Sequence, residues 1–129
     1  MNYNILIVDD SRTVRAVIAK ALRITKIQTE NVFEAENGKI GLEIVADNKI
    51  DLIFADINMP IMNGIEMIEK LKANSATSLI PIVVVSTEAS LARTTRLETI
   101  GVHATIQKPF HPEQLRVVVN DALEGSHDV

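Results

Sequence analysis

Short apolar segments alternate with longer segments of helical periodicity along this chain. The short segments are too short to form helices. The clearest of them are rich in β-branched residues and flanked by polar residues, which is typical of buried strands. We predict strands at residues 5–8, 31–35, 52–55, 82–85 and 104–107, of which 31–35 is the weakest.

Between the strands, apolar residues recur at the spacing of a helix face. Ser11 suits the N-cap of a first helix that runs to about Thr25, and Pro112 starts the last helix. The segment 91–100 has a poor apolar stripe, so we expect this fourth helix to be loosely anchored. The predicted core faces are Val14, Ile18, Ala21 and Leu22, then Leu42, Val45 and Ala46, then Ile65, Ile68 and Leu71, and finally Leu115, Val118, Val119 and Ala122.

Regular alternation of strand and helix predicts a parallel sheet with helices on both faces. The expected fold class is α/β, a flavodoxin-like, doubly wound (βα)5 sheet with strand order 2-1-3-4-5. A chain of 129 residues has room for one such domain. We therefore expect residues 1–129 to form a single domain without an output domain.

Composition narrows the classes of function. The chain has no cysteine, which excludes a disulfide framework and a thiolate metal site and fits a reducing compartment. Its net charge is −4 without a dense cluster of basic residues, which argues against nucleic acid as a direct partner. No apolar run approaches the roughly 20 residues of a membrane span, and no signal peptide is recognisable. We therefore expect a cytoplasmic protein that does not insert into membranes.

Polar residues suited to phosphoryl chemistry follow four of the predicted strands. They are Asp9 and Asp10 after the first strand, Asp56 after the third, Ser86 after the fourth and Lys108 after the fifth. In the expected strand order the three carboxylates meet, and their repulsion raises at least one pKa unless a cation compensates. Oxygen ligands without His or Cys favour Mg²⁺, or Mn²⁺, over zinc. Asp56, between the other acids and the Lys and Ser side, is the best nucleophile for a phosphoryl group.

Each of these residues also has an ordinary structural interpretation. Asp9 and Asp10 can be the acidic start of a helix, Ser86 can simply end a strand, and Lys108 can be a solvated loop lysine. Their joint position at the carboxyl ends of strands favours a binding site. Two kinds of protein with a similar topology are the alternatives. A flavin carrier needs a phosphate-binding loop after the first strand, where this chain has two acids. An aspartyl-phosphate phosphatase needs two acids that lie two residues apart, whereas Asp9 and Asp10 are adjacent.

Four motifs make the chain resemble a known family. They are Val8-Asp9-Asp10-Ser11, the segment 56–64 (Asp-Ile-Asn-Met-Pro-Ile-Met-Asn-Gly), the segment 85–89 (Val-Ser-Thr-Glu-Ala) and the segment 108–110 (Lys-Pro-Phe). From Ile5 to Leu123, the chain resembles the receiver domain of two-component response regulators. The resemblance implies that Asp56 takes a phosphoryl group from a phosphohistidine on a sensor histidine kinase, and that Ser86 and Lys108 bind that group. The implied Mg²⁺ ligands are Asp9, Asp10, Asp56 and the backbone carbonyl of Asn58.

The same resemblance implies a monomeric signalling protein that is not an enzyme beyond its own phosphorylation and dephosphorylation. Its target protein would bind the face made by the fourth helix, fifth strand and fifth helix. The resemblance also implies that the Lys108–Pro109 peptide bond is cis. The chain is most similar to stand-alone chemotaxis regulators, in which the residues corresponding to Asn58 and Glu88 modulate the lifetime of the phosphate, here expected to be seconds to minutes. A phosphorelay shuttle and a receiver that regulates a kinase are the alternatives. Thr105 stands where the family often has a switch aromatic residue.

Overall fold

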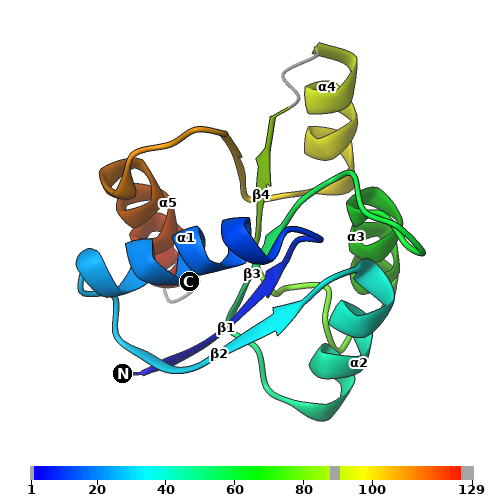
Figure 1. The fold of residues 1–129 in the computed structure, drawn as a ribbon. Helices are drawn as coiled ribbons and strands as arrows, with labels where there is room; N and C mark the ends of the chain where they lie inside the picture. Colours follow the sequence, from blue (N-terminus) through cyan, green and yellow to red (C-terminus); the bar gives the residue numbers. More distant parts are fainter. Residues whose placement is uncertain (1, 88–90, 126–129) are drawn as a thin grey trace.

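The computed structural model describes residues 2–87 and 91–125, which form alternating strands and helices (Figure 1). The strands are β1 (Tyr3–Val8), β2 (Thr29–Ala35), β3 (Leu52–Ala55), β4 (Ile82–Ser86) and β5 (Ala104–Gln107). The helices are α1 (Arg12–Ile24), α2 (Gly38–Asp47), α3 (Gly64–Ala73), α4 (Leu91–Ile100) and α5 (Pro112–Gly125). All strand pairs are parallel and their order is β2-β1-β3-β4-β5, so the predicted fold class is confirmed.

Helices cover both faces of the sheet, α1 and α5 on one side and α2 and α3 on the other (Figure 1). Successive residues of a strand point to opposite faces. Ile5 and Ile7 of β1 accordingly pack with α1 and α5, whereas Leu6 and Val8 pack with α2 and α3. Every residue of β3 and β4 is buried, as expected for strands covered on both sides. None of the described helices is long and apolar enough to cross a membrane.

Besides β4, which runs one residue further than predicted, to Ser86, two strands begin earlier than the sequence pattern predicts. β1 begins at Tyr3 and β2 at Thr29, and these two residues pair across the strands. The additional residues are polar or partly exposed, because they lie at one end of the sheet and, in β2, on its edge. Backbone pairing extends the strands there although no apolar run marks it.

The prediction for the core face of α2 was partly wrong. Val45 is buried and Leu42 packs against the core, but Ala46 is exposed. Gly41 faces the sheet instead, where an added Cβ would lie 3.2 Å from Val8 Cγ2 and 3.0 Å from Met67 Sδ. A helix that approaches the sheet this closely does so through its smallest residue, which a search for apolar side chains does not detect.

The poor apolar stripe of α4 is confirmed for the part whose side chains are described. Within residues 95–100, Leu97 is buried and Ile100 packs against the α2–α3 core, while the other side chains are exposed. Arg96 forms a surface ion pair with Glu69 of α3. The described part of α4 is therefore anchored by its contacts with α3 and by the buried side chain of Leu97.

Candidate functional site

Parallel strand pairing continues beyond β1 and β3 and fixes the backbone of two acids. The N–H of Asp56 donates to the carbonyl of Val8 at 2.9 Å, and the N–H of Asp9 donates to Ala35 at 3.0 Å. Oxygen atoms of Asp9, Asp10 and Asp56 consequently lie within 4.8 Å of one another. The sequence prediction that these three carboxylates meet at the carboxyl edge is confirmed.

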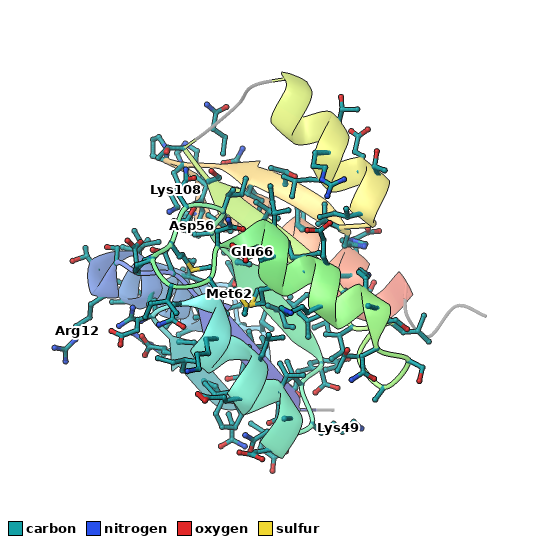
Figure 2. The ribbon with its side chains drawn as sticks, turned by 90° about the vertical axis from the view of Figure 1, so that its right-hand side faces the viewer. Arg12, Lys49, Asp56, Met62, Glu66 and Lys108 are labelled. Carbon is teal, nitrogen blue, oxygen red and sulfur yellow. The ribbon has the colours of Figure 1, made fainter. Side chains whose placement is uncertain are left out.

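Asp9 is the most enclosed of the three acids, with 2% of its surface exposed. Its Oδ1 accepts the backbone N–H of Ser11 at 2.8 Å, and its Oδ2 pairs with Lys108 Nζ at 2.9 Å. The same ammonium group lies 3.8 Å from Asp56 Oδ2. Figure 2 shows Lys108 and Asp56 together at this end of the molecule, whereas Lys49 lies at the opposite end. Lys108 thus bridges two acids that come from different strands.

The environment of Asp56 raises the pKa of its carboxyl group. Burial is the largest cause, and the negative charges of Asp9 and Asp10 act in the same direction. Lys108 and the N–H of Ile57, which donates to Asp56 Oδ1 at 2.8 Å, lower the pKa in part. Three carboxylates facing one ammonium group leave uncompensated negative charge, which a divalent cation would neutralise. The all-oxygen donor set fits Mg²⁺, or Mn²⁺, better than zinc.

The loop between β3 and α3 forms one wall of the site and is held at two points. The N–H of Gly64 donates to Ile57 at 2.9 Å, and the N–H of Gly38 donates to Met62 at 3.0 Å. Gly64 lies directly on the backbone of Asp56, where an added Cβ would be only 2.0 Å from the carbonyl oxygen. Asn63 caps α3 by accepting the N–H of Glu66. The loop can follow this tight path only because Gly64 has no side chain.

Within this loop, Ile61 has an unfavourable backbone conformation. Its φ is +69° and the residue is 78% exposed. A β-branched residue is strained in this left-handed region, by about 1–2 kcal/mol. The loop therefore stores strain beside the acidic site, which consists of Asp9, Asp10 and Asp56, without any gain in buried surface.

Replacing Ile61 with asparagine is expected to stabilise the protein by about 0.5–1 kcal/mol, because asparagine tolerates the left-handed region. Chemical denaturation followed by circular dichroism measures the change. Leu79→Asn is the matched control, because Leu79 is 91% exposed and has no positive φ. Equal stabilisation by both substitutions would show that removal of exposed apolar surface, and not backbone strain, is the cause.

The remaining predicted residues lie in different positions around the site. Ser86 is buried at the end of β4, and its carbonyl accepts the N–H of Lys108 at 2.9 Å, which brings these two residues together. Lys108–Pro109 is a cis peptide, as expected. Asn58 is exposed on the loop after β3. Glu88 lies outside the described residues.

Thr105 is exposed on β5. It borders a groove of about 450 Å³ between β5 and α5, whose lining also includes Gln107, Gln114 and Val118. His103, just before β5, is exposed and pairs with Asp121 of α5 at 2.9 Å. The described part of this face therefore presents polar side chains around an open groove.

Sequence reasoning missed Arg15, which contacts the site, and Glu34, which pairs with Arg15. Arg15 donates to the backbone carbonyl of Asp9 at 2.6 Å and pairs with Glu34 of β2 at 2.9 Å. A weak signal was available, because Arg15 lies one helical turn after the N-cap Ser11, near the end of β1. Nothing in the sequence indicates that its partner is a backbone carbonyl.

The fold and this site define a class of protein. The family model of the response regulator receiver domain matches residues 5–120, and the chain belongs to this family.

Among its relatives is the chemotaxis protein CheY1 of Helicobacter pylori, 36% identical over 127 residues, or 96% of this chain and 98% of that protein. A chemotaxis protein CheY homologue of Campylobacter jejuni is 35% identical over 120 residues, or 92% of this chain and 91% of that protein. The solved structure of chemotaxis protein CheY4 of Vibrio cholerae has a TM-score of 0.85 at 28% identity, covering 95% of this chain and all of that one.

Proposed function

We propose that this protein is a response regulator that accepts a phosphoryl group on Asp56 from a sensor histidine kinase. The supporting observation is the arrangement around Asp56, in which Lys108 Nζ lies 3.8 Å from its Oδ2 and two further carboxylates lie nearby. Similarity to chemotaxis proteins over nearly their whole length supports a role in chemotaxis signalling.

In the proposed reaction, a carboxylate oxygen of Asp56 attacks the phosphorus of a phosphohistidine. An O–P bond forms as the N–P bond breaks, and the released imidazole takes up a proton. Lys108 exchanges its contact with Asp9 for one with a phosphoryl oxygen, and the Ser86 hydroxyl donates to another. A Mg²⁺ ion held by Asp9, Asp10, Asp56 and the carbonyl of Asn58 would supply positive charge to the phosphoryl oxygens.

Hydrolysis returns the protein to its starting state. Water attacks the phosphorus, the O–P bond to Asp56 breaks, and inorganic phosphate leaves. The protein consumes no other substrate, so it acts as a switch and not as an enzyme with turnover of its own.

Phosphorylation adds close to two negative charges next to Lys108. The N–H of Lys108 donates to the carbonyl of Ser86. We therefore expect movement at either residue to reach the ends of β4 and β5. We place the target protein on the α4–β5–α5 face, where a change in these strand ends alters the exposed surface.

Incubation with acetyl phosphate tests the proposal. Intact mass spectrometry is expected to show one added phosphoryl group when Mg²⁺ is present and none when it is chelated, and borohydride trapping is expected to locate the group on Asp56. After removal of the donor, the group is expected to disappear within minutes. A phosphoryl group on another residue, or one independent of Mg²⁺, would contradict the proposed acceptor.

A further inference from the structure

Arg15 connects three parts of the molecule next to the acidic site. It lies in the first turn of α1, where its N–H donates to the N-cap residue Ser11 at 3.0 Å, and its side chain is 14% exposed. Its Nη1 donates to the carbonyl oxygen of Asp9 at 2.6 Å, and its Nε donates to Glu34 Oε1 at 2.9 Å. One guanidinium group therefore links α1, the loop after β1, and the edge strand β2.

Arg15 completes the hydrogen bonding of Asp9. The N–H of Asp9 donates to Ala35, the neighbour of Glu34, and its two carboxylate oxygens contact Ser11 and Lys108. The carbonyl is the remaining polar group of this almost fully buried residue. It belongs to the peptide that joins Asp9 to Asp10, so the orientation of this peptide governs where the Asp10 carboxylate lies relative to the other two acids.

Glu34 gives the guanidinium group a partner outside the site. A positive side chain close to three carboxylates would otherwise be attracted to them, where it would compete with a bound cation. The Glu34 side chain, 47% exposed on β2, forms an ion pair with Nε and leaves Nη1 directed at the carbonyl. The planar, forked guanidinium group can hold two different acceptors at fixed positions, which a lysine ammonium group cannot reproduce.

We propose that Arg15 and Glu34 are positioning residues for the acidic site. They hold the Asp9–Asp10 peptide in the orientation that lets Asp9, Asp10 and Asp56 accept a divalent cation together. This inference rests on the proposed function in one respect, namely that the bound cation serves the phosphorylation of Asp56.

The sign of the change in Mg²⁺ affinity distinguishes positioning from simple electrostatics. Removing a positive charge near an acidic site strengthens cation binding if charge alone matters. Arg15→Ala is instead expected to weaken Mg²⁺ binding about tenfold, as is typical when a group that orients metal ligands is lost. Arg12→Ala is the matched control, because Arg12 carries the same charge three residues earlier but is exposed and points away from the site (Figure 2).

Isothermal titration of the metal-free protein with MgCl₂ measures these dissociation constants, at a temperature well below the unfolding transition of each variant. Arg12→Ala is expected to bind Mg²⁺ as tightly as the parent or slightly more tightly. Unchanged or tighter binding by Arg15→Ala would overturn the proposal. Because the readout is metal affinity of folded protein, a loss of stability alone does not produce the expected result.

Glu34 provides a second test that does not alter α1. Glu34→Gln keeps an oxygen that can accept from Nε and is expected to bind Mg²⁺ nearly as the parent does, whereas Glu34→Ala is expected to weaken binding. Arg15→Ala combined with Glu34→Ala is expected to be no weaker than Arg15→Ala alone, because the two residues act through one contact. Additive losses would contradict a shared role. Acetyl phosphate labelling of the parent reports separately on the proposed function.

Discussion

Asp56→Asn is expected to abolish phosphorylation and, in the metal-free protein at neutral pH, to increase the free energy of unfolding. The two effects have opposite directions because they have different causes. Phosphorylation needs a carboxylate nucleophile, which an amide cannot replace. Folding requires the same carboxylate to lie within 4.8 Å of two other acids. Like charges at that distance repel by roughly 3 kcal/mol at an effective dielectric constant of about 20.

Lys108 offsets part of this repulsion, so we expect a net gain of about 1–2 kcal/mol for Asp56→Asn. The pH dependence follows from the raised pKa of Asp56, whose ordinary value is 3.8. A raised pKa in the folded state means that protonation of Asp56 favours folding. This contribution is fully present below pH 3.8 and is lost as the pH rises through the raised pKa. The advantage of the asparagine variant should therefore appear over that pH range and persist at neutral pH.

Urea denaturation of both proteins in the presence of a chelator, repeated across this pH range, measures the difference. Mg²⁺ should then stabilise the parent more than the variant, because the variant lacks one ligand. Asp51→Asn is a useful control, because Asp51 lies at the other end of β3 and its Oδ2 accepts the N–H of Asn4 at 2.8 Å. Equal stabilisation by Asp51→Asn, or none by Asp56→Asn, would show that repulsion among the three acids does not limit stability.

The acidic site could be predicted from sequence because its position depends on few variables. Buried parallel strands are readable as apolar runs, and the residue after each run lies at the carboxyl edge. Once the order 2-1-3-4-5 is assumed, Asp9 and Asp56 become neighbours. Lys108 follows β5 and therefore lies at the same edge of the sheet. No side-chain conformation has to be known to reach this result.

Features that depend on backbone detail could not be predicted in this way. The contact of Arg15 with the carbonyl of Asp9 involves an acceptor that every residue has, so no residue type signals it. The positive φ of Ile61 is a property of the loop path, and isoleucine is a residue that argues against it. The role of Gly41 at the α2–β1 contact likewise arises from the absence of a side chain, whereas Ala46 looked like a core residue by spacing alone.

Gly64→Ala is expected to destabilise the protein by about 3 kcal/mol or more, near the upper end of the cost of inserting atoms into a packed structure. The new Cβ would lie 2.0 Å from the carbonyl oxygen of Asp56 and 3.0 Å from Ile57 Cα. Both neighbours are backbone atoms, so no side-chain rotation relieves the overlap. The loop must move away from β3, which breaks the hydrogen bond from Gly64 to Ile57.

Gly101→Ala separates this effect from the general cost of replacing glycine. Gly101 has φ +91°, but the nearest atom to an added Cβ is Lys72 Cε at 3.7 Å, so this variant introduces backbone strain without overlap. We expect it to cost about 1 kcal/mol and to leave acetyl phosphate labelling at the parent rate. Gly64→Ala should instead lose labelling in whatever fraction remains folded, because the displaced backbone is that of the phosphate acceptor itself. Denaturation curves and labelling rates measured together test both statements, and similar behaviour of the two variants would mean that the loop adapts without moving Asp56.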